Sequence, residues 1–187
     1  MSRSFLGVRF LSRIVLERLA AVTLFLILAQ SVRAADTAVQ VQMDTKGAGP
    51  RQVEALTEHG IIRDYRFAWT SMGQALSVNA LDPIEGPFVG DAKQWLRETV
   101  LGQQRSGLSQ KYLNQTHHLE VVFYAPEGDV IELHDTAEYQ LQLLAAGKII
   151  HDEHVVMHYV VLMTPGADRW VVRHLQAVPQ FSAVPQF

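Results

Sequence analysis

Residues 119–178 read LEVVFYAPEGDVIELHDTAEYQLQLLAAGKIIHDEHVVMHYVVLMTPGADRWVVRHLQAV, and this stretch decides the fold class. It holds four runs rich in Val, Ile, Leu, Tyr, Phe and Trp. The turn signals between the runs are Pro126-Glu127-Gly128-Asp129, Ala146-Gly147-Lys148 and Pro165-Gly166-Ala167-Asp168. Such runs between turn residues predict four consecutive antiparallel strands. Residues 108–116 are expected to be a connection that leads into them.

The part of the chain before these strands is predicted to be helical. Residues 51–59 favour a short helix that stops at Gly60, and residues 61–76 repeat apolar side chains at spacings of three and four. A further helix is expected to be capped by Asp91 and to end at Gly107. Helices followed by a strand meander predict an α+β fold. In this fold the N-terminal helices pack on a curved antiparallel sheet of about four strands.

The chain divides into four predicted parts. Residues 1–34 are a targeting segment, and residues 35–50 are a flexible lead-in with a short extended piece at residues 38–43. Residues 51–178 form a single α+β domain, because no repeat of domain size is present in the 187 residues. Residues 179–187 are a tail.

The targeting segment, residues 1–34, has the pattern of a secretory signal. It begins with several arginines, continues with an apolar core at residues 19–29, and offers small residues before a cut after Ala34. The alternative is a retained membrane anchor. Only fourteen residues lie between Arg18 and Arg33, whereas a spanning helix needs roughly 20 apolar residues. Both readings place the remainder outside the cytoplasm, in a periplasm or in the extracellular space.

Composition excludes several classes of function. The chain has no Cys, so it has no disulfide framework, no thiolate metal site and no cysteine nucleophile. Residues 1–34 carry five Arg and one Glu, a net charge of +4; the whole chain carries −3, so the remainder carries −7. Such an acidic domain without a basic cluster is not expected to bind nucleic acid, and it contacts a membrane only if the leader is retained. No cofactor is indicated, because no Gly-rich phosphate loop is present.

Asp135 is the first candidate for chemistry. Strand alternation places it with Leu133 on the apolar face of the second strand, where a carboxylate must be paired or have a raised pKa. A raised carboxyl group on a pocket wall suits a general acid or base. The alternative is a β-bulge that turns Asp135 to solvent, or a purely structural partner. His174 on the inward side of the last strand and Tyr65 on the long helix are its candidate catalytic companions.

The inner face of the sheet and the helix stripe are expected to line a pocket. The predicted lining residues are Trp69, Phe123, Leu133, Tyr139 and Trp170. A metal ion is not expected, because His154 and His158 would stand about 13 Å apart along a strand. Residues 154–163 are apolar on both sides, which predicts a sheet covered on both faces, either by helices and a small apolar ligand or by a second subunit in a homodimer.

The tail repeats itself. Ala177-Val178-Pro179-Gln180-Phe181 is followed by Ser182 and then by the identical pentapeptide at residues 183–187. Five residues are too short for a solenoid repeat. Two interpretations stay open: a docking peptide whose Pro-Gln-Phe enters a partner groove, and a frayed terminus.

These residues together resemble a known superfamily. The pattern Tyr65-x-x-Ala68-Trp69 on a long helix, and Gly166-x-x-x-Trp170-Val171-Val172 in the last hairpin, are similar to the nuclear transport factor two-like fold, also called cystatin-like or polyketide-cyclase-like. The resemblance covers residues 61–178 and implies a cone-shaped sheet wrapped around the helices. Its members include isomerases, dehydratases and cyclases, and also non-catalytic modules of secretion, division and transport machines. The last two strands are also similar to the terminal domain of a plastid-division membrane protein.

The resemblance leaves two functions to be weighed. The first is an exported, non-catalytic binding or assembly module that holds a small apolar ligand or a partner subunit. The second is an isomerase or dehydratase, because enzymatic members place an Asp, a His or a Tyr in the cone. The matching residues are Asp135 as the base, Tyr65 as the donor to a developing oxyanion and His174 as the acid or orienting group.

Overall fold

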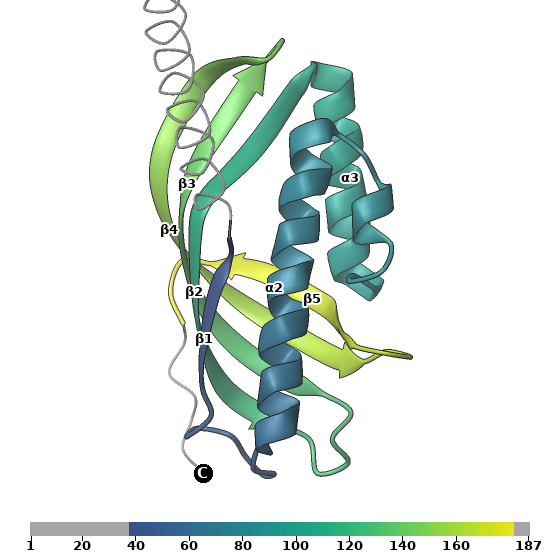
Figure 1. Cartoon of the computed structure of the whole chain (residues 1–187), viewed down its shortest axis with the longest axis vertical. Coiled ribbons are helices and arrows are strands. Elements are labelled where there is room, and N and C mark those ends of the chain that lie inside the picture. The colour runs from purple at the N-terminus through teal and green to yellow at the C-terminus, as the bar shows by residue number, and fades with distance from the viewer. Residues whose placement is uncertain (1–37, 182–187) are drawn as a thin grey trace, which may run out of the picture. The chain divides into compact units, whose positions relative to one another are not determined.

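The computed structural model describes residues 38–181 (Figure 1). The predicted leader and the second copy of the tail repeat lie outside these residues. In chain order the elements are β1 (Gln40–Asp44), α2 (Ala55–Val78), a 3-10 turn η1 (Asp82–Ile84), α3 (Gly90–Ser106), β2 (Leu108–Tyr124), β3 (Ile131–Ala145), β4 (Lys148–Pro165) and β5 (Trp170–Val178). The fold is α+β, with helices packed on a sheet, as the sequence predicts.

The sheet has five strands and is mixed. The strand order is β1-β2-β3-β4-β5, with β1 parallel to β2 and every other pair antiparallel. The predicted sheet of about four strands, all antiparallel, is wrong in the number of strands and in the direction of one of them. The additional strand is the parallel strand β1, which lies at the edge of β2 and takes most of its residues from residues 38–43. The pairing of Gln40 with Thr116 joins segments far apart in the chain, and a five-residue segment carries little pattern of its own.

β2 begins earlier than predicted. The expected connection at residues 108–116 is part of this strand, and it pairs with β3 from Leu108 opposite Ala145 to Leu113 opposite Gln140. The ladder is interrupted after Leu113, where Asn114 has a left-handed backbone with φ 52°. Such a bulge and the polar side chains near it break the alternation on which a strand prediction depends.

The long helix α2 is continuous, whereas the sequence predicts a break at Gly60. A Cβ atom at Gly60 would lie 3.8 Å from the Trp170 side chain, an ordinary van der Waals distance, so the indole packs beside the helix here without requiring a glycine. Glycine inside a helix costs about 1 kcal/mol relative to alanine, and the buried stripe on either side of it offsets that cost. α3 ends at Gly107, as predicted, with φ 66°, and Asp91 lies in its first turn rather than at its cap. No helix within residues 38–181 is long and apolar enough to cross a membrane.

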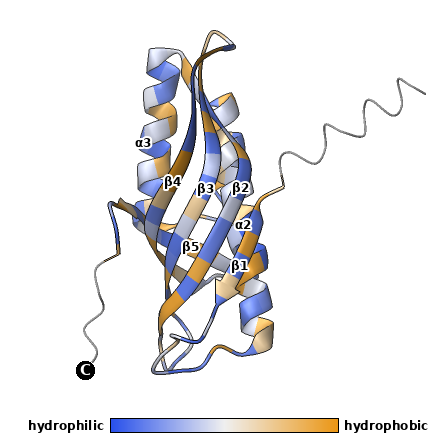
Figure 2. Cartoon of the chain, turned by 90° about the vertical axis from the view of Figure 1, so that its left-hand side faces the viewer, coloured by the Kyte–Doolittle hydropathy of each residue, from blue (hydrophilic) through white to orange (hydrophobic). Residues whose placement is uncertain are grey.

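The core lies between the helices and one face of the sheet. The inward side of the strands carries Leu119, Val121 and Leu133, each at most 1% exposed. The stripe on α2 packs against them, through the buried residues Ile61, Tyr65, Ala68, Trp69, Met72, Ala75 and Leu76. Figure 2 shows the sheet from the side away from the helices, and this side is called the outer face below.

Phe123 does not line the core, and its predicted place there is wrong. The register of β2 shifts between Val121, opposite Leu133, and Phe123, opposite Glu132. Adjacent residues of β3 point to opposite faces, so the shift turns Phe123 away from the face of Val121. Phe123 is 40% exposed, and Tyr124 is buried in the core instead.

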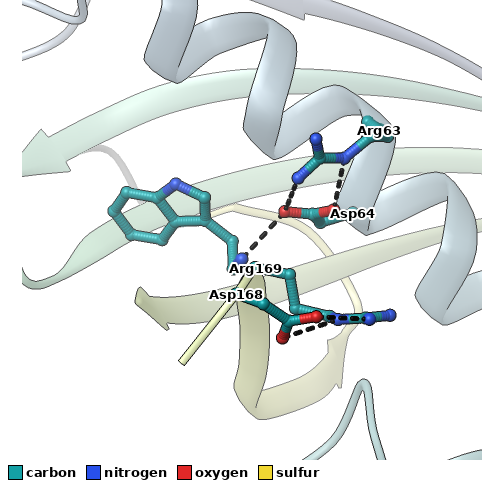
Figure 3. Close-up of polar contacts among 5 residues, drawn as sticks. Arg63, Asp64, Asp168 and Arg169 are labelled. Atoms are coloured by element: carbon teal, nitrogen blue, oxygen red, sulfur yellow. Dashed lines mark hydrogen bonds and ion pairs between the residues drawn. The ribbon is translucent and has the colours of Figure 1, made fainter. Parts of the chain in front are cut away.

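A polar contact fixes α2 to the start of β5 (Figure 3). The carboxylate of Asp64, 4% exposed, accepts a hydrogen bond of 2.8 Å from the backbone N–H of Trp170. Arg63 donates to both oxygens of Asp64 at 2.8 and 3.0 Å, and this bond raises the pKa of the Arg63 guanidinium. The contact holds α2 in register against the sheet next to Tyr65, the following residue of the helix.

Candidate functional site

Asp135 lies at the centre of the inner face. It is opposite Leu119 of β2 and Tyr159 of β4, and none of its side chain is exposed. The alternation of β3 predicts this position, and the alternative in which a bulge turns Asp135 to solvent is not adopted. A carboxyl group at such a depth requires hydrogen-bond partners.

Two side chains meet one oxygen of Asp135. The Tyr65 hydroxyl donates to Oδ2 over 2.7 Å, and His117 Nδ1 lies 2.8 Å from the same oxygen. Tyr65 comes from α2, His117 from β2 and Asp135 from β3, and all three are 0% exposed. We call these three residues the Asp–His–Tyr cluster. The structure therefore brings Tyr65 and Asp135 together, as the sequence hypothesis requires, and adds His117.

His117 is the site residue that sequence reasoning missed. The adjacent pair His117 and His118 suggests only polar residues at the entry of a strand. Alternation from the apolar run would have found it, because His117 shares a face with Leu119 and Val121 at steps of two. The strand begins nine residues before His117, at Leu108, so His117 is an interior position.

His174 does not join the cluster, contrary to the expected pairing with Asp135. Its Nδ1 lies 3.7 Å from Asp91 of α3, and its Nε2 lies 3.3 Å from Gln176. The register of β5 shifts here, because Val172 is opposite Met163 while His174 is opposite Leu162. One extra residue in β5 therefore turns His174 off the face that simple alternation assigns to it.

An aromatic shell surrounds the cluster. The ring of Trp69 lies 4.2 Å from that of His117 and 5.4 Å from that of Tyr159, measured between centroids. Tyr139 and Tyr112 also pack near Trp69, at 6.2 and 6.3 Å. The hydroxyls of Tyr139 and Tyr159 are hydrogen-bonded to each other over 3.0 Å. The predicted lining residues Trp69, Leu133 and Tyr139 are thus buried core residues, and Trp170 packs against the core while partly exposed.

Two polar atoms of the cluster have no hydrogen-bond partner among residues 38–181. They are Oδ1 of Asp135 and Nε2 of His117, and both are buried. A buried polar atom without a partner costs about 1–3 kcal/mol. An enclosed water molecule or a polar ligand atom would satisfy either one.

Burial controls the ionisation of the tyrosines. It raises the pKa of Tyr65, and the neighbouring charge of Asp135 raises it further. Burial also raises the pKa of Tyr112 and of Tyr159, in each case assisted by Tyr139, and it raises the pKa of Tyr139 itself. All four hydroxyls therefore stay neutral donors in the folded protein at ordinary pH.

Raising the pH above about 10 is expected to unfold the protein, because free tyrosine ionises near that value. The unfolded chain then holds fewer protons than the folded chain, so stability is full below pH 10 and falls as the pH rises. Urea midpoints measured from about pH 8 to pH 11 test this. Tyr159→Phe removes one such group and should make the fall shallower. Titration of every tyrosine near pH 10 in a protein that keeps its folded circular dichroism would contradict the expectation.

Among the residues that the structure describes, no group of three or more His, Asp or Glu side chains is placed to hold a metal ion. The Asp–His–Tyr cluster offers one carboxylate and one imidazole, and structural zinc sites use four protein ligands. The carboxylate, imidazole and phenol of the cluster can form hydrogen bonds and exchange protons.

Comparison with known proteins places the fold but not the activity. No family model and no curated protein matches this sequence. The crystal structure of the intermembrane space region of the chloroplast protein ARC6 is similar, with a TM-score of 0.53 and 14% sequence identity. The match covers 69% of this chain and 98% of that one. At this identity the chain is similar to that region in fold alone.

Proposed function

We propose that this chain is an exported, non-catalytic module that binds or assembles with a partner, built on a cone-shaped sheet of the nuclear transport factor two-like kind. The arginine-rich leader supports export, and helices on one face of a twisted sheet support the cone. The packing around Trp69 favours a partner subunit over a small apolar ligand, because aromatic side chains fill the space between α2 and the sheet.

One observation carries the non-catalytic role. Tyr65, His117 and Asp135 are each 0% exposed, so no reacting atom of the Asp–His–Tyr cluster reaches solvent. A general base must come within hydrogen-bond distance of the substrate proton, and an enclosed carboxylate cannot do so without a large opening. The same contacts have an evident structural use, because they join α2, β2 and β3 at one point.

The outer face supplies the proposed contact surface. It combines polar side chains with exposed apolar ones: Val156 is 57% exposed and Phe123 is 40% exposed. At the start of β4, beside the turn from β3, Ile149 and Ile150 are 53% and 56% exposed. Contiguous exposed apolar patches mark surfaces that meet a second molecule, and aromatic side chains such as Phe123 are enriched in them.

Val156→Asp is expected to weaken self-association at least about tenfold, because it replaces an exposed apolar side chain of the proposed contact surface by a charge opposite Glu138, at a cost of roughly 1.4 kcal/mol or more. Sedimentation equilibrium of the purified protein measures the change. Val78→Asp is the matched control, because Val78 is 63% exposed but lies at the end of α2. A monomeric wild-type protein, or equal effects of the two substitutions, would contradict assembly through the outer face.

The second candidate is an isomerase or dehydratase, and a specific observation favours it. Oδ1 of Asp135 and Nε2 of His117 are buried without partners among residues 38–181, and such atoms can receive and return a proton. In this reading Asp135 is the base and Tyr65 stabilises the oxyanion, with His117 in place of His174. It requires a motion that opens the cluster to a substrate.

A further inference from the structure

The tail of the chain returns to the outer face of the sheet. The ring of Phe181 stacks on the imidazole of His134, with 4.3 Å between centroids and 5° between planes. It also meets His158 edge-on at 4.9 Å. His134 belongs to β3 and His158 to β4, so Phe181 spans two strands that are far from it in sequence. We call His134 and His158 the histidine pair.

The path to this contact follows from the residues of the repeat. Ala177 and Val178 complete the pairing of β5 with β4, opposite Tyr159 and His158. Pro179 has no N–H to donate and ends the ladder. Three residues beyond Val178, Phe181 has crossed β4 to reach His134. The pentapeptide thus combines two strand residues, a strand breaker and an aromatic anchor.

The histidine pair is held in position by other contacts. His158 Nδ1 lies 3.2 Å from the hydroxyl of Thr136, and His134 Nε2 lies 3.7 Å from Glu132. His134 is only 9% exposed although it belongs to the outer face. An ordered imidazole of this kind offers a flat surface for an aromatic ring.

The repeat supplies a second ligand for the same surface. Residues 183–187 have the same sequence as the segment Ala177–Phe181, so they can make the same side-chain contacts. Only Ser182 separates the two copies. Ala177 and Val178 of the first repeat occupy the last positions of β5 opposite β4. Residues 183–187 of the same chain therefore cannot take these strand positions.

We infer that the histidine pair is a docking site for a Pro-Gln-Phe segment, filled within each chain by the first repeat and open by exchange to residues 183–187 of a second copy. This inference rests on the assembly role proposed above. The first repeat is tethered beside its own histidine pair, where its effective concentration is about a millimolar or more. Residues 183–187 of a second chain can compete with this tethered first repeat only where the outer faces of the two chains are already held together. The exchanged tail then links two chains in the manner of a domain swap.

A peptide titration tests the docking site. The amidated peptide Ser-Ala-Val-Pro-Gln-Phe is titrated by calorimetry into purified Phe181→Ala/Phe187→Ala protein, in which both tail anchors are removed. The peptide is expected to bind with a Kd of about 1 mM or tighter, and at least about twofold more weakly to wild type, whose own tail competes. The same peptide with Ala in place of Phe should not bind.

Matched receptor variants locate the site. His134→Ala, added to the double variant, should abolish binding, whereas His118→Ala should leave it unchanged. His118 is an exposed histidine of β2 two strands away from His158, and both pair with Thr136 of β3. Equal binding by both receptor variants, or no binding to the double variant while its circular dichroism is native, overturns the docking site.

Self-association separates exchange from the assembly role. Phe187→Ala is expected to weaken sedimentation-detected association severalfold while the first repeat stays docked. Unchanged association in Phe187→Ala, together with a large effect of Val156→Asp, overturns tail exchange and leaves assembly through the outer face standing. Peptide binding without any self-association of wild type overturns both the exchange and the assembly role, and it leaves the histidine pair as a site for the chain's own tail.

Discussion

Asp135→Ala is expected to lower the free energy of unfolding by about 3–5 kcal/mol, because two buried polar groups lose their acceptor at about 1–3 kcal/mol each. The substitution leaves the Tyr65 hydroxyl and His117 Nδ1 without an acceptor, at a point where neither reaches water. A domain of this kind is stable by only about 5–15 kcal/mol. The loss therefore corresponds to a decrease in Tm of roughly 6–20 °C, measured by circular dichroism and by urea unfolding.

Two variants control this experiment. Both hydrogen bonds end on Oδ2 of Asp135, so Asp135→Asn keeps one oxygen that can accept both and should cost clearly less than alanine. Glu138→Ala changes an exposed carboxylate of the same strand, and it should alter stability by no more than about 0.5 kcal/mol. A loss below about 1 kcal/mol for Asp135→Ala would show that the Asp–His–Tyr cluster does not hold α2 to the sheet.

The asparagine variant also separates the two proposed functions. Asn cannot take up a proton as a carboxylate does. If Asp135 is the base of an isomerase or dehydratase, Asp135→Asn stays folded and loses turnover. If the cluster is structural, the same variant keeps partner binding in proportion to its remaining stability.

The sequence predicts the inner face of the sheet well, and the reason is physical. Side chains alternate between faces as long as a strand pairs regularly, so Leu119, Leu133 and Asp135 fall inside as expected. The predictions fail immediately after register shifts. Phe123 and His174 each follow a shift, in β2 and in β5. A shift depends on the partner strand, so the local sequence does not reveal it.

The candidate site shows the same division between local and non-local information. Tyr65 is predictable from the helix stripe and Asp135 from strand alternation, and the two meet. His117 was within reach of the same argument, because it lies one alternation step before Leu119, but only if β2 is taken to begin before the polar pair His117 and His118. The cost of continuing α2 through Gly60 is offset by burial of the helix stripe against the sheet, and this tertiary packing is likewise absent from the local pattern.

Trp69→Ala is expected to cost about 3–5 kcal/mol, because it removes a large side chain that is 2% exposed and leaves a cavity. The ring centroid of Trp69 lies 4.2 Å from that of His117 and 5.4 Å from that of Tyr159. Loss of the indole therefore also removes packing contacts around the Asp–His–Tyr cluster. Urea unfolding followed by circular dichroism measures the change. Trp95→Ala is the matched control, since Trp95 is 44% exposed on α3 and should cost far less.

A ligand experiment on the same variant then tests whether the interior can hold an apolar molecule. An apolar cavity made by truncating a core side chain can bind a small aromatic compound, and a ligand that binds only the folded state raises its stability. Indole is therefore expected to raise the Tm of Trp69→Ala and to leave wild type unchanged, because Trp69 occupies that space. If Trp69→Ala does not fold, Trp69→Phe keeps an aromatic ring and still leaves part of the cavity. A comparable rise for wild type would instead indicate a ligand space between α2 and the sheet, and would favour a small apolar ligand over a partner subunit.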